Sequence, residues 1–507
     1  MAKLWRFPLH SLILGAYAIL ALIAFNLQES PLSEAVRSLA AGLLLATVLL
    51  VLLKLLHKNW ARAGLIASVL LIAFFSYGHL YDALKLLGAP GLLLARHRFL
   101  LPLWLAPTAL AVWRILKLKN MGGATAALNF IALFLLIFPL FQISSFLIRN
   151  WFAQQEQPAS TTRALSLQAS ADAPDVYYII ADAYARDDVL QSFYHFDNRD
   201  FLAQLQGLGF YVAQCSLSNY PKTRLSLTSS LNMDYMEGLG ITANDQADEF
   251  WRRIRNSTVR KTFEAQGYKI VSFETGFYWT EWPDADLYLS REKQGLNGVQ
   301  LNSFETLLLK TTLLRAVVDL QPLLSQPLVN AVEISPLQEH YDITRYALDT
   351  LPQLAQVAGP KFVFVHLLIP HGPFVFDAEG NFTTEELSLE EAYNQQMIYL
   401  NRRLLEIFTT LINESERPVV IILQGDHGGP GTQYSHDRMK ILNAYYLPEG
   451  SNQLYPSISP VNSFRLIFDT YFEYEYPLVD DLSYYSTSEN FFNMTLISDD
   501  RPGCTQS

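Results

Sequence analysis

Cysteine is scarce in this chain of 507 residues, which contains only Cys215 and Cys504. So few cysteines exclude a disulfide-dense secreted scaffold, in which several bridges replace a hydrophobic core. Both cysteines follow residue 150. If that part of the chain lies outside the cytoplasm, a Cys215–Cys504 bridge would tie down the C-terminal tail. Two unpaired thiols are the equal alternative.

Acidic residues are almost absent from the first 150 positions, which hold 13 Lys/Arg and only 3 Asp/Glu. The remaining positions hold 24 basic and 45 acidic residues, so the net charge changes from about +10 to about −21. The acidic part lacks the basic stripe of a nucleic-acid-binding protein, which argues against a nucleic-acid partner. The length and the change in composition together predict two domains.

The first 150 residues consist largely of apolar runs, each close to the ~20 residues that a helix needs to cross a bilayer. Basic flanks such as Lys3, Lys54 and Arg114 place the N-terminus in the cytoplasm. We therefore expect a transmembrane domain over 1–150, in an inner or plasma membrane, with everything after it extracytoplasmic. Five spans are expected, at Leu12–Leu27, Ala40–Leu56, Ala63–Tyr81, Leu100–Ile115 and Ala124–Leu147.

Residues 151–174 are mostly polar and small, which predicts a linker. In 175–507, apolar runs alternate with amphipathic helical segments, and this alternation predicts an α/β domain with a mostly parallel central sheet. Residues 281–336 do not fit the alternation and are expected to form an insertion against the membrane. The expected strands are Val176–Ile180, Tyr268–Phe273, Phe362–Leu367, Val419–Leu423 and Leu442–Leu447, and the expected helices are Asp200–Gly207, Phe250–Gln266, Leu337–Val357 and Leu389–Ile412.

Two of the expected strands end in residues that bind metals. Asp182 follows the first, and Gly425-Asp426-His427-Gly428-Gly429 follows the fourth. Ligands of open α/β sheets bind at the carboxyl ends of the strands, so we expect Asp182, Asp426 and His427 in one crevice. Carboxylates with an imidazole suit Zn²⁺ or Mn²⁺, and the glycines would permit a sharp turn. A helix N-cap at Asp182 and a solvated glycine turn are the alternatives.

A nucleophile for such a site is predicted at Thr223, which follows Pro221 at the expected start of a helix. The helix dipole and a metal would both lower the pKa of its hydroxyl, so we expect Thr223 to be nucleophile and metal ligand together. Ser218 and Ser226 are competing nucleophiles, and a simple N-cap is the alternative role for Thr223.

Three histidines lie near these segments. His371 follows the strand Phe362–Leu367 and is predicted to be catalytic. His366 lies within that strand, where a hydrogen-bonded core residue is more common than a ligand. His436 comes ten residues after Asp426 and is predicted to reach the same cleft, with a solvated loop as the alternative.

With these motifs the chain resembles the alkaline phosphatase/sulfatase superfamily. It looks most like the branch with five transmembrane helices before an extracytoplasmic catalytic domain, which includes lipoteichoic acid synthases and lipid A phosphoethanolamine transferases. The resemblance implies a mostly parallel sheet between helices and a bound Zn²⁺ or Mn²⁺ ion. By this resemblance, Asp182 is the acidic metal ligand and Thr223 is the nucleophile. Asp426 and His427 match the family's Asp-His pair, and His366 and His371 match the His-x-x-x-x-His-Gly-Pro motif.

One departure from the family narrows the expected chemistry. Conventional sulfatases need Cys/Ser-x-Pro-x-Arg, whereas Cys215-Ser-Leu-Ser-Asn219 has neither the Pro nor the Arg. We therefore expect a metal-dependent transferase that moves a phospho-head-group from a phospholipid to an envelope glycan or lipid. A sulfatase-like hydrolase or phosphodiesterase is the alternative, and a degenerate site that serves an assembly or transport partner is a third.

Overall fold

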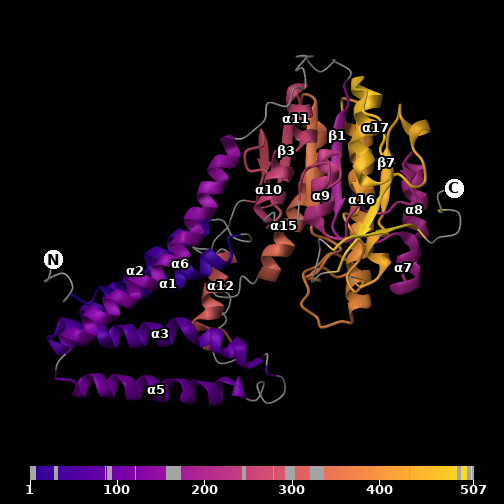
Figure 1. Ribbon diagram of the computed structural model, residues 1–507. Coiled ribbons are helices and arrows are strands. Elements are labelled where there is room, and N and C mark those ends of the chain that lie inside the picture. Colours follow the sequence, from indigo (N-terminus) through magenta and orange to yellow (C-terminus); the bar gives the residue numbers. More distant parts are fainter. Residues whose placement is uncertain are drawn as a thin grey trace. The chain divides into compact units, whose positions relative to one another are not determined.

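The computed structural model describes residues 7–27, 32–85, 87, 94–119, 121–155, 173–241, 247–277, 279–291, 303–319, 336–432, 434–487, 493–499 and 504. The chain divides into two compact units (Figure 1). The helical unit comprises Met1–Thr161 and Lys293–Pro336, and the sheet unit comprises Thr162–Glu292 and Leu337–Ser507. Most of the predicted linker, residues 156–172, lies outside the described residues.

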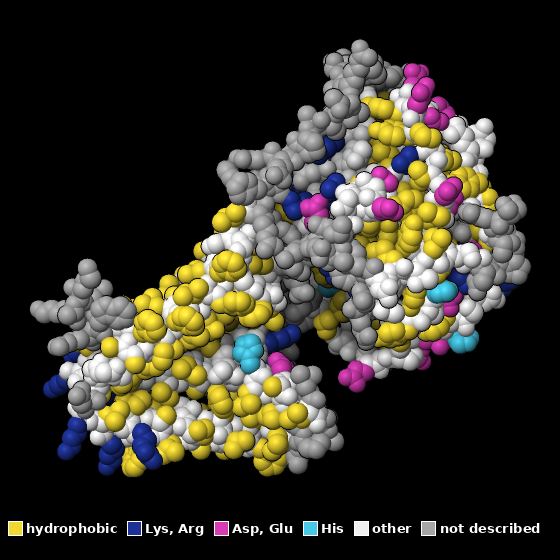
Figure 2. All heavy atoms as spheres, in the orientation of Figure 1, with side chains coloured by type: hydrophobic (Ala, Val, Ile, Leu, Met, Phe, Trp, Pro, Cys, Tyr) yellow, Lys and Arg dark blue, Asp and Glu magenta, His cyan; other side chains and the backbone are white. Residues whose placement is uncertain are grey.

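Within the described residues, the helical unit contains five apolar helices at the predicted positions. They are α1 (Leu9–Phe25), α2 (Leu32–His57), α3 (Trp60–Lys85), α5 (His97–Lys117) and α6 (Gly122–Gln155). All but α1 are long and apolar enough to cross a membrane, while α1 has 17 residues. Figure 2 shows hydrophobic side chains spread over the surface of these helices. By length and composition, this is a multi-pass membrane protein.

Part of the predicted insertion belongs to the helical unit. Its helices α12 (Ser303–Thr311) and α13 (Leu314–Asp319) lie on α2 and α3. Arg37 of α2 pairs with Glu305, and Arg315 pairs with Asp82 of α3 at 2.8 Å. These ion pairs fasten this part of the predicted insertion to the apolar helices, whereas Leu287–Leu289 of the same predicted segment forms strand β4 of the sheet.

The sheet unit is built on a seven-stranded sheet with the order β2-β7-β6-β1-β5-β3-β4. The neighbours β6, β1, β5, β3 and β4 are parallel, and β7 runs antiparallel to β6 and β2, which confirms the predicted mostly parallel sheet. The sequence missed β2 and β4, which are too short to show a strand period. The bounds are β1 Asp175–Ala181, β2 Tyr211–Val212, β3 Lys269–Phe273, β4 Leu287–Leu289, β5 Lys361–Leu367, β6 Val419–Gln424 and β7 Asn443–Tyr446.

Helices cover both faces of this sheet (Figure 1). In β1, Tyr177 and Ile179 pack on one face, Tyr178 and Ile180 pack on the other, and all four are fully buried, so the strand is a continuous apolar run. The first face is covered by α7 (Asp187–Phe193), α8 (Arg199–Gly207), α15 (Pro336–Thr350) and α16 (Leu389–Glu414). The second is covered by α9 (Thr223–Asn232), α10 (Ala247–Arg255), α11 (Thr258–Ala265) and α17 (Pro460–Phe472).

Two predicted helices differ in the structure. The segment Phe250–Gln266 is two helices, α10 and α11, because the Ser257 side chain accepts from Arg260 N at 3.3 Å and starts a new helix. The segment Leu337–Val357 ends as an α-helix at Thr350 and continues as the 3₁₀-helix η4 (Leu351–Gln356), where Pro352 lacks the N–H that an α-helix needs.

The C-terminal segment forms a separate hairpin of β8 (Ser483–Tyr485) and β9 (Thr495–Ile497). Beyond it, Cys504 is bonded to Cys215, which is the first of the two alternatives for the cysteines. Short 3₁₀-helices, η5 (His436–Met439) and η6 (Ser451–Gln453), complete the elements of this unit.

Candidate metal centre

Asp182 and Asp426 lie side by side because each follows a strand of the central parallel pair. β1 and β6 are in register up to Ile180 and Gln424, so both acids leave the sheet at the same edge. Their exposed fractions are 5% and 0%. Asp426 Oδ1 accepts from Ala183 N at 3.0 Å. Asp182 Oδ1 and Asp426 Oδ2 are buried and have no hydrogen-bond partner among the described residues.

The backbone around Asp182 and Asp426 packs closely against neighbouring segments. Ala183 has φ 64°, a left-handed conformation that disfavours residues with a side chain, and in this conformation its N–H faces Asp426. The predicted role of the glycines was a sharp turn, yet none of Gly425, Gly428 and Gly429 has a positive φ. A Cβ at Gly428 would lie 2.5 Å from Asp437 O, and one at Gly429 would lie 2.2 Å from the Tyr194 hydroxyl.

His427 lies at the centre of the site, with its Nε2 close to Thr223, Asp426 and Asp182. Its Nδ1 lies 3.0 Å from the Gly428 carbonyl, which can only accept, so Nδ1 carries the proton. Around Nε2 lie Thr223 Oγ1 at 3.2 Å, Asp426 Oδ2 at 3.4 Å and Asp182 Oδ1 at 3.7 Å. Burial, aided by the positive charge of Arg438, lowers the pKa of His427 to about 4, so the imidazole is neutral at neutral pH.

These four groups fit a divalent metal. Ligands about 2.0 Å from a tetrahedral Zn²⁺ ion lie about 3.3 Å from one another, close to the observed separations. The orphaned carboxylate oxygens and the neutral imidazole are the donors such an ion requires. The ligand set predicted from the sequence, Asp182, Thr223, Asp426 and His427, could therefore hold such an ion, and it stays a prediction.

His366 also belongs to this centre, although its strand position favoured a core role. Its Nδ1 lies 3.2 Å from Thr280 Oγ1, as expected of a hydrogen-bonded core histidine. Its Nε2 lies 3.2 Å from Asp182 Oδ2, and Asp182, His366 and Asp426 offer ligand atoms within 4.8 Å of one another. Asp182 thus presents one oxygen to His427 and the other to His366, so His366 is a further candidate ligand.

The ionisation of Asp182 reflects these imidazoles. Burial alone would raise the pKa of its carboxyl group, but the neighbouring His371, His366 and His427 outweigh that penalty and hold the pKa well below its usual value. Asp182 is therefore a carboxylate at neutral pH, as a metal ligand must be.

The structure distinguishes the three candidate hydroxyls. Thr223 is the first residue of α9 and is 8% exposed, with its Oγ1 beside His427. The Ser218 hydroxyl is buried and donates to the Tyr220 carbonyl at 2.7 Å. Ser226 is fully buried one turn further along α9. Only Thr223, among these three, combines contact with His427 and a helix N-terminus that stabilises negative charge.

The two predicted catalytic histidines are placed differently. His371 N donates to Asp182 O at 3.1 Å, and its ring centre lies 6.1 Å from that of His427, so it borders the centre. His436 begins η5 and is exposed, with its ring 5.1 Å from Tyr485 of β8. Of the two predicted catalytic histidines, His371 therefore lies at the border of the centre, and His436 lies on the surface of the sheet unit.

Arg438, two residues after His436, also contacts the centre, although it was not predicted from the sequence. Its guanidinium donates from Nε to Pro221 O at 3.1 Å and from Nη1 to Gly428 O at 2.9 Å, and its Nη2 lies 3.0 Å from His427 Nε2. It therefore bridges the segment that precedes Thr223 and the segment that carries His427. A basic residue close to a predicted catalytic histidine was the available signal.

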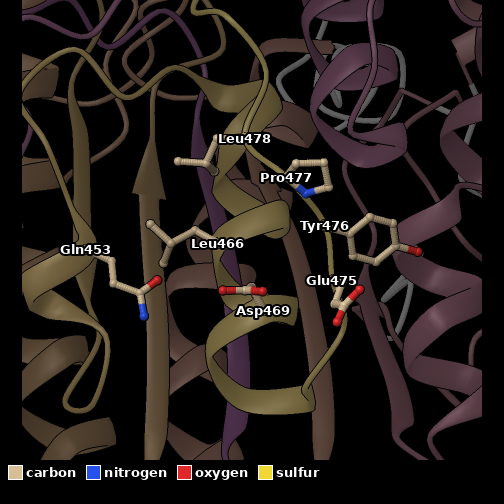
Figure 3. A pocket seen from close by; sticks show the side chains of 7 residues that line it. All are labelled: Gln453, Leu466, Asp469, Glu475, Tyr476, Pro477 and Leu478. Carbon is tan, nitrogen blue, oxygen red and sulfur yellow. The ribbon is translucent and has the colours of Figure 1, made fainter.

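A pocket beside α17 is separate from this centre and differs from it in chemistry (Figure 3). Two carboxylates, Asp469 and Glu475, line it, and its lining includes no basic side chain, which disfavours an anionic ester as its ligand. The lining residues are Gln453, Leu466, Asp469, Glu475, Tyr476, Pro477 and Leu478.

A parallel α/β sheet with carboxylates, imidazoles and a hydroxyl at its carboxyl edge defines a class of protein, the metal-dependent enzymes that act on esters. The model of the Sulfatase family matches residues 174–457, which is more than half of the chain. The protein therefore belongs to the Sulfatase family, as a superfamily enzyme of the phosphotransferase or ester-hydrolase type. No curated protein sequence matches the chain significantly.

Among solved structures, similar folds include two phosphoethanolamine transferases. The integral membrane lipooligosaccharide phosphoethanolamine transferase A (EptA) from Neisseria meningitidis is 11% identical with a TM-score of 0.39, over 92% of this chain and 94% of that chain. The C-terminal periplasmic domain of EcEptC from Escherichia coli, in complex with Zn, is 11% identical with a TM-score of 0.42, over 65% of this chain and 93% of that chain.

Proposed function

We propose that this protein is a membrane-anchored, metal-dependent transferase of the cell envelope. It would move a phospho-head-group from a phospholipid to a glycan or lipid acceptor through a phosphothreonine at Thr223. The proposal rests on one observation: the Thr223 hydroxyl lies 3.2 Å from His427 Nε2, the same nitrogen that lies 3.4 Å from Asp426 Oδ2 and 3.7 Å from Asp182 Oδ1. The apolar helices support a lipid donor, because helices of this length and composition would anchor the enzyme in a bilayer.

The chemistry of the first half-reaction follows from the positions of the side chains. A Zn²⁺ or Mn²⁺ ion bound by Asp182, Thr223, Asp426 and His427 would lower the pKa of the hydroxyl and neutralise charge on the non-bridging oxygens. Thr223 Oγ1 attacks the phosphorus in line, the Oγ–P bond forms, and the bond from phosphorus to the lipid alcohol breaks. Thr223 loses one proton and the departing alcohol gains one.

The second half-reaction reverses these events with a new partner. The acceptor hydroxyl loses its proton, attacks the phosphothreonine and releases Thr223. We assign the proton transfers to His371, which borders the centre, and to His436, which lies on the surface where an acceptor would arrive. The catalytic domain is extracytoplasmic in this proposal, as the basic flanks of the spans predict.

A second candidate function uses the same residues with water as the acceptor, which makes the protein a phosphodiesterase or sulfatase-like hydrolase. The departure of Cys215–Asn219 from the sulfatase motif favours the transferase over sulfate-ester hydrolysis. The two functions differ in their need for an acceptor glycan or lipid.

Turnover of the full chain in phospholipid nanodiscs tests the proposal, with release of the lipid alcohol measured in the presence and absence of envelope glycan. We expect wild type and Ser226→Ala, which removes another hydroxyl from the same helix, to release the lipid alcohol in both conditions. Without acceptor each molecule should release it once, and with acceptor it should turn over repeatedly. Thr223→Ala should release none while retaining its fold. Full turnover by Thr223→Ala would refute the proposal, and undiminished turnover without acceptor would favour the hydrolase.

A further inference from the structure

Lys85, Arg96 and Arg98 lie at the end of the helical unit where basic residues are least expected. They flank the short connection from α3 to α5, and all three side chains are exposed. With the N-terminus in the cytoplasm, as predicted, α3 ends and α5 begins on the extracytoplasmic side. Lys and Arg are depleted from short loops on that side of a membrane, so topology does not account for these three cations.

Helix α13 marks the same end of α3 as extracytoplasmic. All residues after 150 are predicted to lie outside the cytoplasm, and α13 belongs to this part of the chain. Its Arg315 lies with its guanidinium carbon 4.0 Å from the ring centre of Tyr81, and it pairs with Asp82 at 2.8 Å. Both contacts are at the end of α3 that bears Lys85, so this end faces outward.

The start of α5 is held against the end of α3 by an aromatic cluster. The imidazole of His97 is stacked on Tyr81 with the ring centres 5.0 Å apart, and its Nδ1 lies 2.7 Å from the Tyr77 hydroxyl. Lys85 Nζ lies 4.6 Å from the centre of the same Tyr81 ring. Because Arg96 and Arg98 flank His97 in the sequence, these contacts bring both of them to the end of α3 that carries Lys85.

The positive charge at this end is only partly compensated by the protein. Asp82 is paired with Arg315. Among the described residues, no carboxylate forms an ion pair with Lys85, Arg96 or Arg98, and the connection 86–95 contains no acidic residue in its sequence. Like charges that gather at the edge of a low-dielectric region repel one another, and a bound anion relieves that repulsion.

The surroundings of these cations distinguish a lipid from a soluble anion. Leu87, Leu94, Phe99 and Leu103, which lie in the connection and in the first two turns of α5, are all exposed. Cations beside exposed apolar side chains at the end of a span match a phospholipid, whose phosphate meets the cations while its acyl chains lie along the apolar surface. A soluble anion would leave the apolar side chains uncovered.

We propose that the extracytoplasmic end of α3 and α5 binds the phosphate group of an anionic phospholipid through Lys85, Arg96 and Arg98. Each cation near an anionic lipid surface strengthens binding by about fivefold. The site lies within the helical unit and uses no residue of the metal centre. It therefore adds a lipid-binding site that is independent of the proposed function.

Photocrosslinking of a phosphatidylglycerol analogue tests this inference. The full chain would be placed in phosphatidylcholine nanodiscs with an increasing fraction of phosphatidylglycerol that carries a diazirine on its head-group, and labelled peptides would be identified by mass spectrometry. We expect labelling of wild type within residues 84–104. Unlabelled phosphatidylglycerol should compete for this labelling, and a phosphatidylcholine analogue with the same diazirine should label these residues weakly.

The matched variants remove two cations from either end of the helical unit. Lys85→Gln with Arg98→Gln should raise the lipid fraction needed for half-maximal labelling of residues 84–104 by about 10- to 30-fold. The control is Lys54→Gln with Lys117→Gln at the predicted cytoplasmic ends, where each lysine also lies 5.5 Å from the centre of an aromatic ring. It should leave labelling of residues 84–104 as in wild type.

Three results would overturn the inference. They are equal labelling of residues 84–104 by the two analogues, unchanged labelling in Lys85→Gln with Arg98→Gln, and an equally large loss in the control, which would show an effect of net charge alone. If the double variant does not fold, Arg98→Glu decides the matter, because reversing one charge should weaken labelling by at least as much as removing two. Thr223→Ala should be labelled as wild type is, so its turnover tests the proposed function separately.

Discussion

Replacing Asp426 with Asn should have opposite effects on the metal-free and the metal-bound protein. Asn keeps the shape and the Oδ1 acceptor for Ala183 N, and it removes the negative charge. Asp426 Oδ2 has no hydrogen-bond partner among the described residues, and Asp182 is buried in the same centre. Without a metal, two neighbouring buried carboxylates destabilise the fold, so we expect Asp426→Asn to stabilise the metal-free protein by about 1–2 kcal/mol.

In the presence of metal, Asp426→Asn should instead make the protein less stable than wild type. A ligand at one hundred times its dissociation constant stabilises the native state by about 2.7 kcal/mol, and wild type should gain that amount in zinc. Asp426→Asn lacks one of the donors and should gain less than about 1 kcal/mol under the same conditions.

Asp175→Asn is the matched control, because Asp175 is a buried aspartate at the opposite end of β1. Its carboxylate pairs with Lys361, and both side chains are 1% exposed. Removing that carboxylate leaves Lys361 buried without its partner, which should cost about 3–5 kcal/mol and leave the zinc response unchanged.

Thermal unfolding of the purified full chain, followed by tryptophan fluorescence with excess zinc and with chelator, measures both effects. In chelator we expect Asp426→Asn to be the most stable, wild type to be intermediate and Asp175→Asn to be the least stable. A full zinc-induced increase in Tm for Asp426→Asn would contradict this account of the centre, as would equal destabilisation of the two variants in chelator.

Three further predictions concern other contacts in the sheet unit. Gly429→Ala should lower stability by about 1–3 kcal/mol, since its Cβ would lie 2.2 Å from the Tyr194 hydroxyl, and Tyr194→Phe should rescue part of the loss in denaturant unfolding. Cys504→Ser should cost about 2–5 kcal/mol and expose the C-terminal segment to protease, while zinc affinity persists. Burial lowers the pKa of His340 to about 4, so its contribution is complete above pH 6.5 and is lost as pH falls toward 4. Unfolding from pH 7 to 4 should show up to about 3 kcal/mol of this loss, absent in His340→Gln.

The strands and the residues proposed as central ligands were predictable because their signals are local. Val419–Leu423 is apolar throughout, as a strand buried on both faces must be, and the parallel order brings the residues after it to Asp182. The helix break at Ser257 was missed because apolar residues continue across it, and a single capping side chain decides the matter.

The parts of the centre that the sequence did not reveal depend on contacts between distant segments. His366 becomes a candidate ligand only because β5 pairs with β1 in the register that sets it opposite Ile180. Arg438 enters the centre through carbonyls of two loops, and its place beside His436 in the sequence is only a weak signal of such contacts. The choice of Thr223 over Ser226 follows from the contact of Thr223 with His427, a residue about two hundred positions away, which a run of hydroxyl residues does not disclose.

The most direct test of the central claim is the intact mass of the zinc-loaded full chain after incubation with envelope phospholipids in the absence of acceptor. A phosphothreonine intermediate predicts a covalent adduct with the mass of a phospho-head-group, located at Thr223, absent from Thr223→Ala and present in Ser226→Ala. An unmodified mass in wild type, with zinc bound and lipid alcohol released, would contradict a phosphothreonine intermediate.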